Sequence, residues 1–229
     1  MLKSIFVTGT DTEVGKTVVS CGLVKALQGK FSIVNGYKPI AAGTEIFALG
    51  EGNEDAFALM GVNSSELSYS DVNPVMLKHA IAPHIAANIE NTPVNTELMT
   101  SGLQNLSSKS DFVVVEGAGG WHVPLNDSGL MMSNWVAEQQ IPVVLVVGVK
   151  LGCLNHALLT VEAIKASGCK LVAWVANNLN ETSDISKLNI RYLQAAIEAP
   201  CIAELPYNTS LDADLAAECF ELDALISKI

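Results

Sequence analysis

Basic side chains are scarce in this sequence of 229 residues. It has 13 Lys and Arg against 24 Asp and Glu, and Arg191 is its single arginine. The formal charge of −11 disfavours a nucleic-acid or anionic-membrane partner, because such surfaces are bound through clusters of basic side chains. Any phosphate group that the protein handles must therefore be met mainly by lysines or by a metal ion.

Paired cysteines and long apolar runs are also missing. The five cysteines are odd in number, widely spaced and without a CxxC pair, which predicts core side chains in a reducing compartment rather than disulfides or zinc ligands. The longest apolar run, Ile141 to Val149, contains Pro142 and Gly148 and is about half a membrane span. The first residues hold too short an apolar stretch for a signal peptide. We expect a cytoplasmic protein with no membrane partner.

Short β-branched runs alternate with segments of helical periodicity, which is the pattern of an α/β fold. The composition, 49% hydrophobic and 16% charged, fits strands that are buried on both faces. The runs that predict strands are Ser4 to Thr8, Ile33 to Tyr37, Phe112 to Glu116, Val143 to Val147, Leu171 to Ala176 and Cys201 to Leu205. The periodic segments that predict helices are Lys16 to Leu27, Leu98 to Leu106, Ser133 to Gln139, Leu154 to Ala166, Ile185 to Ala196 and Asp214 to Ser227.

We therefore predict a single domain, residues 1–229, with a mostly parallel sheet flanked by helices. The polar stretch from Gly50 to Asn73 is interpreted as a surface excursion inside this domain.

The strongest motif is GTDTEVGKT, residues 9–17, which lies between a predicted strand and a predicted helix. This is the place of a phosphate-binding loop, in which backbone N–H groups and a helix N-terminus receive phosphates. Lys16 would then reach the β- and γ-phosphates and the Thr17 hydroxyl would bind Mg²⁺. The motif has five residues between its glycines where the strict pattern has four, and a plain turn before a helix is the alternative.

Two charged residues, Lys38 and Glu116, follow or end predicted strands and should lie near this loop, and Asp55 is a weaker candidate that its position in the sequence does not place there. Glu116 ends a buried strand within DFVVVEGAGG, residues 111–120. In open α/β sheets ligands bind in a crevice at the carboxyl ends of the strands, where a carboxylate can hold Mg²⁺ directly or through water. Alternatively, Glu116 could cap a turn. Lys38 follows another strand and is a candidate to stabilise charge in phosphoryl transfer, or a solvent-exposed lysine. Asp55 opens an apolar helical stretch, as a metal ligand or an ordinary first-turn residue.

Two further segments carry weaker signals. KLGCLNH, residues 150–156, leads from a strand into a helix, so its amides and Asn155 could receive an anion or cap the helix. Asn177 ends a strand, where its amide could recognise a base edge or begin a turn.

In this order, GTDTEVGKT, GYKPIAAG, VEGAGGW, VVGVKLGCLNHALLT and WVAN resemble the dethiobiotin synthetases over nearly the whole chain. The resemblance implies a P-loop NTPase-like fold and a longer loop. It also implies a homodimeric, Mg²⁺- and ATP-dependent ligase that forms a cyclic urea from 7,8-diaminopelargonate and CO2. The route runs through a carbamate and a carbamic-phosphoric anhydride, and ADP and phosphate are released.

The same resemblance assigns residues to four parts of the site. Lys16 and Lys38 neutralise the transferring phosphoryl group, and Thr17, Asp55 and Glu116 surround Mg²⁺. The nucleotide is lined by Glu13, Val14, Gly15, Lys16, Thr17, Val18, Asp55, Glu116, Gly117, Ala118 and Gly119, with Asn177, Asn178, Pro206, Tyr207 and Asn208 around adenine. The diamine substrate is met by Thr12, Ala42 and Gly119, and its carboxylate tail by Lys150, Leu151, Asn155 and Tyr192 near the subunit interface.

One position departs from the family pattern. The family usually has Ser or Thr after Lys-Pro-x-x, whereas this chain has Ala42 there. One hydrogen bond to the substrate should be lost, which predicts weaker substrate binding rather than inactivity. Thr44 could supply the hydroxyl instead.

The main alternative is a switch ATPase of the chromosome-partitioning type, which shares the fold. Such proteins carry an extra lysine early in the loop, whereas Thr10 to Glu13 contains none. The low basic content also disfavours DNA binding.

Overall fold

The computed structural model describes residues 4–48, 50–208 and 212–229. Its centre is a six-stranded sheet in the order β10-β9-β8-β1-β7-β2, and every neighbouring pair is parallel. The strands are β1 (Ser4–Gly9), β2 (Val34–Tyr37), β7 (Phe112–Glu116), β8 (Val143–Val149), β9 (Leu171–Asn178) and β10 (Cys201–Leu205). All six predicted strands are confirmed, with ends that differ by up to two residues.

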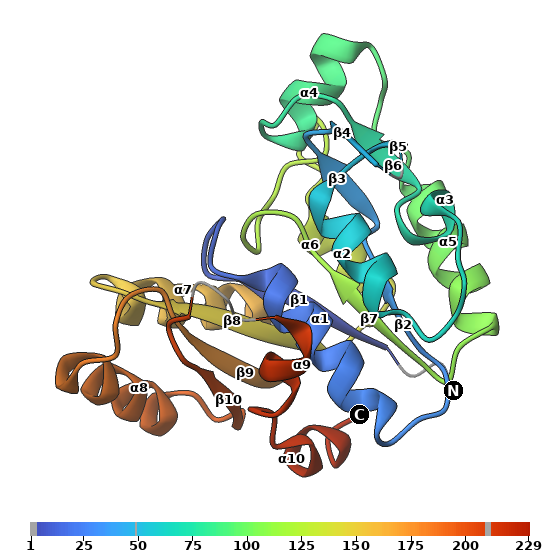
Figure 1. The fold of residues 1–229 in the computed structure, drawn as a ribbon. Helices are drawn as coiled ribbons and strands as arrows, with labels where there is room; N and C mark the ends of the chain where they lie inside the picture. Colours follow the sequence, from blue (N-terminus) through green and yellow to red (C-terminus); the bar gives the residue numbers. More distant parts are fainter. Residues whose placement is uncertain (1–3, 49, 209–211) are drawn as a thin grey trace.

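Helices cover both faces of this sheet (Figure 1). One face packs on α5 (Thr96–Ser108), α6 (Met132–Glu138), α7 (Cys153–Ala166) and α8 (Asp184–Ala196), and the other on α1 (Lys16–Gln28), α9 (Ala213–Ala217) and α10 (Leu222–Ile226). Strand side chains alternate between the two cores: Val113 and Val115 face the first, whereas Phe112 and Val114 face the second. Because both faces of each strand are buried, the strand sequences are apolar almost without interruption.

The predicted single helix from Asp214 to Ser227 is wrong, because the structure has two short helices, α9 and α10. The chain turns between them, where the Glu221 N–H donates to the Ile202 carbonyl of β10 at 2.8 Å. The periodicity of apolar residues predicts one continuous helix here, but a hydrogen bond to the edge strand β10 accompanies the break between α9 and α10.

The predicted surface excursion from Gly50 to Asn73 is also wrong in part. It contains β5 (Gly50–Gly52), α2 (Glu54–Val62) and α3 (Tyr69–Val72), and Leu59 and Val72 are fully buried. Although its composition is mainly polar, it contains a few apolar side chains that pack with Cys21 of α1.

Four smaller elements complete this part of the chain. β3 (Ile40–Ala42) pairs in parallel with β6 (Val75–Leu77), and β4 (Glu45–Phe47) pairs antiparallel with β5. Together with α4 (Pro83–Glu90) they lie at the top of Figure 1, above the carboxyl end of β2. In the described part of the chain, no helix has the length and apolar character needed to cross a bilayer. All five cysteines are free, but the prediction of core side chains holds only for Cys21 and Cys153, because Cys169, Cys201 and Cys219 are half-buried.

Close packing of α1 against α9 gives a stability prediction. A Cβ at Gly22 of α1 would lie 2.8 Å from the Ala216 Cβ, whereas a Cβ at exposed Gly61 of α2 would meet nothing within 4 Å. We expect Gly61→Ala to stabilise by about 0.5–1 kcal/mol through helix propensity. Gly22→Ala should be lower in stability than Gly61→Ala by about 1–3 kcal/mol because of overpacking. Urea unfolding measures both, and equal stabilities would contradict the packing seen at Gly22.

Candidate active site

The site lies where three adjacent strands end. Strand β7 runs between β1 and β2, with Val7 opposite Glu116 and Tyr37 opposite Val115. The loop after β1, the last residue of β7 and the first residue after β2 therefore meet at one edge of the sheet. In open α/β sheets this edge, at the carboxyl ends of the strands, is where ligands bind.

The loop after β1 has the conformation expected for binding phosphate. Glu13 and Gly15 have positive φ values of 55° and 85°, and α1 begins at Lys16 directly afterwards. The Lys16 ammonium donates to the Asp11 carbonyl at 3.1 Å, so the side chain folds back along the loop. Thr12 and Glu13 are exposed, Val14 is buried and Val18 is half-buried. The loop thus has the backbone conformation of a phosphate-binding loop, with Lys16 folded back along it.

Lys38 lies at the centre of the site, between two carboxylates. Its Nζ is 2.6 Å from Asp55 Oδ2, 2.7 Å from Glu116 Oε1 and 3.1 Å from the Gly117 carbonyl. The Thr17 hydroxyl lies 2.6 Å from Asp55 Oδ1 and 3.0 Å from Glu116 Oε1. The structure therefore brings together the three charged residues that the sequence placed on separate elements, and joins them to the phosphate-binding loop.

Burial and charge set the protonation of this cluster. Lys38 is 2% exposed and Glu116 0%. Burial alone would lower the pKa of Lys38, but Glu116 and Asp55 reverse this effect and raise it. For Asp55, burial acts to raise the pKa, and the Lys38 ammonium more than offsets it, so the pKa is lowered. Lys38 is thus held as an ammonium ion.

Lys16 differs from Lys38 in its electrostatic setting. Burial lowers the pKa of Lys16, and the nearby positive charge of Lys38 lowers it further. A bound anion, such as a phosphate group, would offset the repulsion between the Lys16 and Lys38 ammonium groups.

The oxygen atoms around Thr17 suit a hard cation. Glu116 Oε2 is buried and has no hydrogen-bond partner among the residues that the structure describes. Within the described residues no three His, Cys, Asp or Glu side chains form a cage for a metal. Two carboxylates and a hydroxyl are instead the partial set that Mg²⁺ uses when a substrate phosphate completes its coordination.

The predicted adenine-side residues lie further along the same edge. Asn177 Nδ2 donates to the Val14 carbonyl and Asn178 Nδ2 donates to the Leu205 carbonyl, each at 2.9 Å. Asn177 therefore bonds to the phosphate-binding loop, whereas the sequence suggested that it would recognise a base edge or begin a turn. Asn178 Oδ1 is buried without a partner. Pro206, Tyr207 and Asn208 follow β10 and are exposed.

The predicted substrate-side residues lie on several elements. Lys150 Nζ is 3.7 Å from Asp11 Oδ2, and Leu151 is wholly exposed before α7. Asn155 is exposed within α7 and does not cap it, since the N-cap is Gly152. Tyr192 lies on a different helix, α8, and is 54% exposed. Gly117, Ala118 and Gly119 follow β7, and Gly119 has a positive φ of 58°.

Ala42 ends β3 beside Leu77 of β6. The hydroxyl of nearby Thr44 lies 3.3 Å from Glu51 Oε1, on the surface. Thr44 thus makes a hydrogen bond on the surface.

Four residues near the cluster were not predicted. Asp11 contacts both Lys16 and Lys150, and Asn53, Tyr69 and Asn73 connect the segments that carry Asp55 and Lys38. Asn53 precedes Glu54 and Asp55, a helix-start pattern that could have identified it. Tyr69 and Asn73 carry no such local signal.

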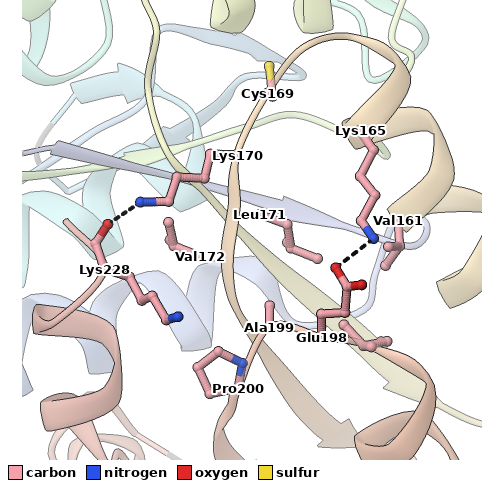
Figure 2. A pocket seen from close by; sticks show the side chains of 11 residues that line it. Val161, Lys165, Cys169, Lys170, Leu171, Val172, Glu198, Ala199, Pro200 and Lys228 are labelled. Atoms are coloured by element: carbon pink, nitrogen blue, oxygen red, sulfur yellow. Dashed lines mark hydrogen bonds and ion pairs between the residues drawn. The ribbon is translucent and has the colours of Figure 1, made fainter.

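A separate pocket of about 310 Å³ lies at the opposite ends of β9 and β10. Figure 2 shows Lys165 paired with Glu198, and Lys170 donating to the backbone carbonyl of Lys228. None of its lining residues is among the predicted site residues, and it is at the amino ends of the strands.

Comparison with known proteins identifies the family of this chain. The family model described as "AAA domain" matches residues 3–214. The ATP-dependent dethiobiotin synthetase of Aliivibrio salmonicida is 45% identical over 226 residues, covering 99% of each chain. That of Vibrio campbellii is 46% identical over 207 residues, covering 90% of this chain and 91% of the relative. This chain belongs to the dethiobiotin synthetase family.

The fold is also similar to that of a solved structure from outside the dethiobiotin synthetases. A ParA family ATPase from Chlorobium tepidum has a TM-score of 0.58 and 14% identity, covering 100% of this chain and 97% of that one. At this identity the likeness concerns the fold alone. It confirms the predicted fold, a mostly parallel sheet flanked by helices.

The close approach of the loop to β9 generates a prediction. A Cβ at Gly15 would lie 2.2 Å from Asn177 Nδ2, at a φ of 85°. Gly15→Ala should displace the loop and weaken ATP binding at least tenfold, that is by about 1.4 kcal/mol or more. Gly168→Ala is the matched control, because Gly168 also has a positive φ, 74°, but a Cβ there would meet nothing within 4 Å. Calorimetric titration with ATP should show unchanged affinity for the control; equal losses would contradict the account.

Proposed function

We propose that this chain is an ATP-dependent ligase that forms the ureido ring of dethiobiotin from 7,8-diaminopelargonate and CO2, releasing ADP and phosphate. The single observation that carries the proposal is the position of Lys38, between Asp55 and Glu116 and next to Thr17 of the phosphate-binding loop. Membership of the dethiobiotin synthetase family, with near-complete coverage, supports the substrate assignment.

The loop from Glu13 to Val18, followed by the 116–119 turn, holds the phosphates of ATP. Lys16 and Lys38 supply positive charge on either side of the transferring group. Thr17, Asp55 and Glu116 would hold Mg²⁺, and Glu116 Oε2, which has no hydrogen-bond partner among the described residues, supports this assignment. When bound, the metal neutralises phosphate charge in the way that P-loop enzymes use it.

The reaction needs three covalent changes. One amine of the diamine adds to CO2 and loses a proton, which gives a carbamate. A carbamate oxygen then attacks the γ-phosphorus and ADP leaves, giving the carbamic-phosphoric anhydride. The second amine attacks the anhydride carbon, loses a proton and expels phosphate, which closes the ring. Lys38 acts in the second step, where preorganised charge stabilises the transferring phosphoryl group.

The other site residues complete the proposal. Asn177, Asn178 and Pro206 to Asn208 frame adenine, with the buried Asn178 Oδ1 as an available acceptor. Thr12, Ala42 and Gly119 meet the diamine. The backbone amides and side chains from Lys150 to Asn155, with Tyr192, hold the carboxylate tail.

A homodimer places this tail site next to a second subunit. Large apolar side chains are exposed on and before α7 and on α8, where a partner would cover them: Leu151, Leu159, Ile185, Leu188 and Tyr192. On α8, Ile185, Leu188 and Tyr192 are three and then four residues apart, so they share one face of that helix.

The decisive experiment measures phosphate release from ATP with Mg²⁺ and bicarbonate, with and without 7,8-diaminopelargonate, and identifies the product by mass spectrometry. We expect release to depend on the diamine, dethiobiotin to form, and EDTA to stop both. Diamine-independent hydrolysis without dethiobiotin would instead support a switch ATPase of the same fold.

Lys38→Ala tests the central side chain. We expect kcat to fall by about 100-fold or more, in the range found when a transition-state donor is removed. The Kd for ATP should rise far less than kcat falls, because most of the charge that Lys38 stabilises develops during transfer. Lys30→Ala is the control: it removes an exposed ammonium 3.2 Å from Asp223 and should leave both values unchanged. A large loss of ATP affinity with unchanged kcat would make Lys38 a binding residue only.

Ala42→Ser tests the departure from the family pattern. The added hydroxyl should lower KM for the diamine by about two- to tenfold, the value of one net hydrogen bond. Thr44→Val should leave this KM unchanged, because the Thr44 hydroxyl bonds to Glu51. Steady-state kinetics at saturating ATP measures both variants. If Ala42→Ser left KM the same or raised it, Ala42 would not contact the diamine.

A further inference from the structure

Three polar residues connect the backbone of Lys38 to the segments that carry Asp55 and Ala42. We call Asn53, Tyr69 and Asn73 the polar relay. The Tyr69 hydroxyl accepts from the Asn53 N–H and donates to Asn73 Oδ1, both at 2.9 Å. Each hydrogen bond orients the next group, because a tyrosine hydroxyl has one proton to donate.

At one end of the relay, Asn73 fixes the backbone of Lys38. Asn73 is 2% exposed, and its Nδ2 donates to the Lys38 carbonyl at 2.7 Å and to the Val75 carbonyl at 3.2 Å. The Lys38 N–H donates to the Val72 carbonyl at 2.8 Å. Both polar backbone groups of Lys38 are thus held by residues 72–73, and the Tyr69 proton determines which end of the Asn73 amide faces Lys38.

At the other end, Asn53 fixes two further segments. Its Oδ1 accepts from the Asp55 N–H at 3.1 Å and caps α2, and its Nδ2 donates to the Gly43 carbonyl at 2.9 Å. Asp55 is the carboxylate that pairs with the Lys38 ammonium, and Gly43 follows Ala42. The relay therefore reaches the backbone of Lys38, of Asp55 and of the residue after Ala42.

We propose that the polar relay is a positioning device that sets the Lys38 ammonium against Asp55 and the Ala42–Gly43 segment. This inference rests on the role of Lys38 under the proposed function. None of the three residues has a polar side-chain atom bonded to the Lys38 ammonium, so each acts through the backbone. Positional errors of about 1 Å at a reacting group can cost up to roughly 100-fold in rate, so loss of the relay should appear in kcat.

Tyr69→Phe is the first test, because it removes one hydroxyl and keeps the ring that packs on Phe57 at a centroid distance of 5.1 Å. We expect kcat to fall roughly tenfold, within the effect that misplacement allows, with the KM for ATP changed less than about twofold. Tyr37→Phe is the matched control. Tyr37 precedes Lys38, and its buried hydroxyl donates to the Met99 carbonyl of α5 at 2.6 Å, away from the relay.

Asn53→Ser provides a second variant that keeps a good N-cap for α2 but lacks the amide that bonds to Gly43. It should raise KM for the diamine and retain the thermal midpoint of the wild type. This variant tests the substrate-side branch of the relay separately from the Lys38 branch.

A double-mutant cycle separates positioning from a general loss of stability. In a Lys38→Ala background, Tyr69→Phe should have almost no further effect on kcat, because the group that it positions is gone. A tenfold loss in both backgrounds, or an equal loss for Tyr37→Phe, would overturn the inference. If Lys38→Ala itself left kcat unchanged, the role of Lys38 under the proposed function would be wrong, independently of the result for Tyr69→Phe.

Discussion

The interaction on which the site depends is the ion pair of Lys38 with Glu116, closed by Asp55. Glu116 is fully buried at the end of a central strand, where an unpaired carboxylate would be strongly unfavourable. The Lys38 ammonium stabilises it at 2.7 Å, and Asp55 then lies on the other side of Lys38 at 2.6 Å. This pairing ties β2, β7 and α2 together. Removal of one partner would leave buried charge behind, so the cluster constrains the fold as well as the chemistry.

The strand order explains why these residues meet and why the same fold serves other reactions. Because β7 lies between β1 and β2, Glu116 is directly between the phosphate-binding loop and Lys38. The next strands, β8, β9 and β10, bring Lys150, Asn177 and Pro206 to the same edge of the sheet. A ParA family ATPase has a similar fold at 14% sequence identity. Function therefore follows from the side chains placed there, not from the fold.

Much of this arrangement could be predicted from the sequence. Buried parallel strands are apolar on both faces, so all six were identifiable. Lys38 follows one of these strands, Glu116 ends another, and Lys16 belongs to a loop with a strong sequence motif. Asn53, Tyr69 and Asn73 were missed because their role depends on hydrogen bonds between segments, which leave no periodic signal. The break between α9 and α10 was missed for the same reason, since it depends on a bond to β10. The buried positions of α2 lie in a stretch whose composition is mainly polar.

The most direct test of the account is a crystal structure of the chain with Mg²⁺, a non-hydrolysable ATP analogue and 7,8-diaminopelargonate. The account predicts the metal on oxygens of Thr17, Asp55 and Glu116, with the Lys38 ammonium within hydrogen-bonding distance of the γ-phosphate. A metal bound elsewhere, with Lys38 contacting only its two carboxylates and the γ-phosphate out of its reach, would contradict it.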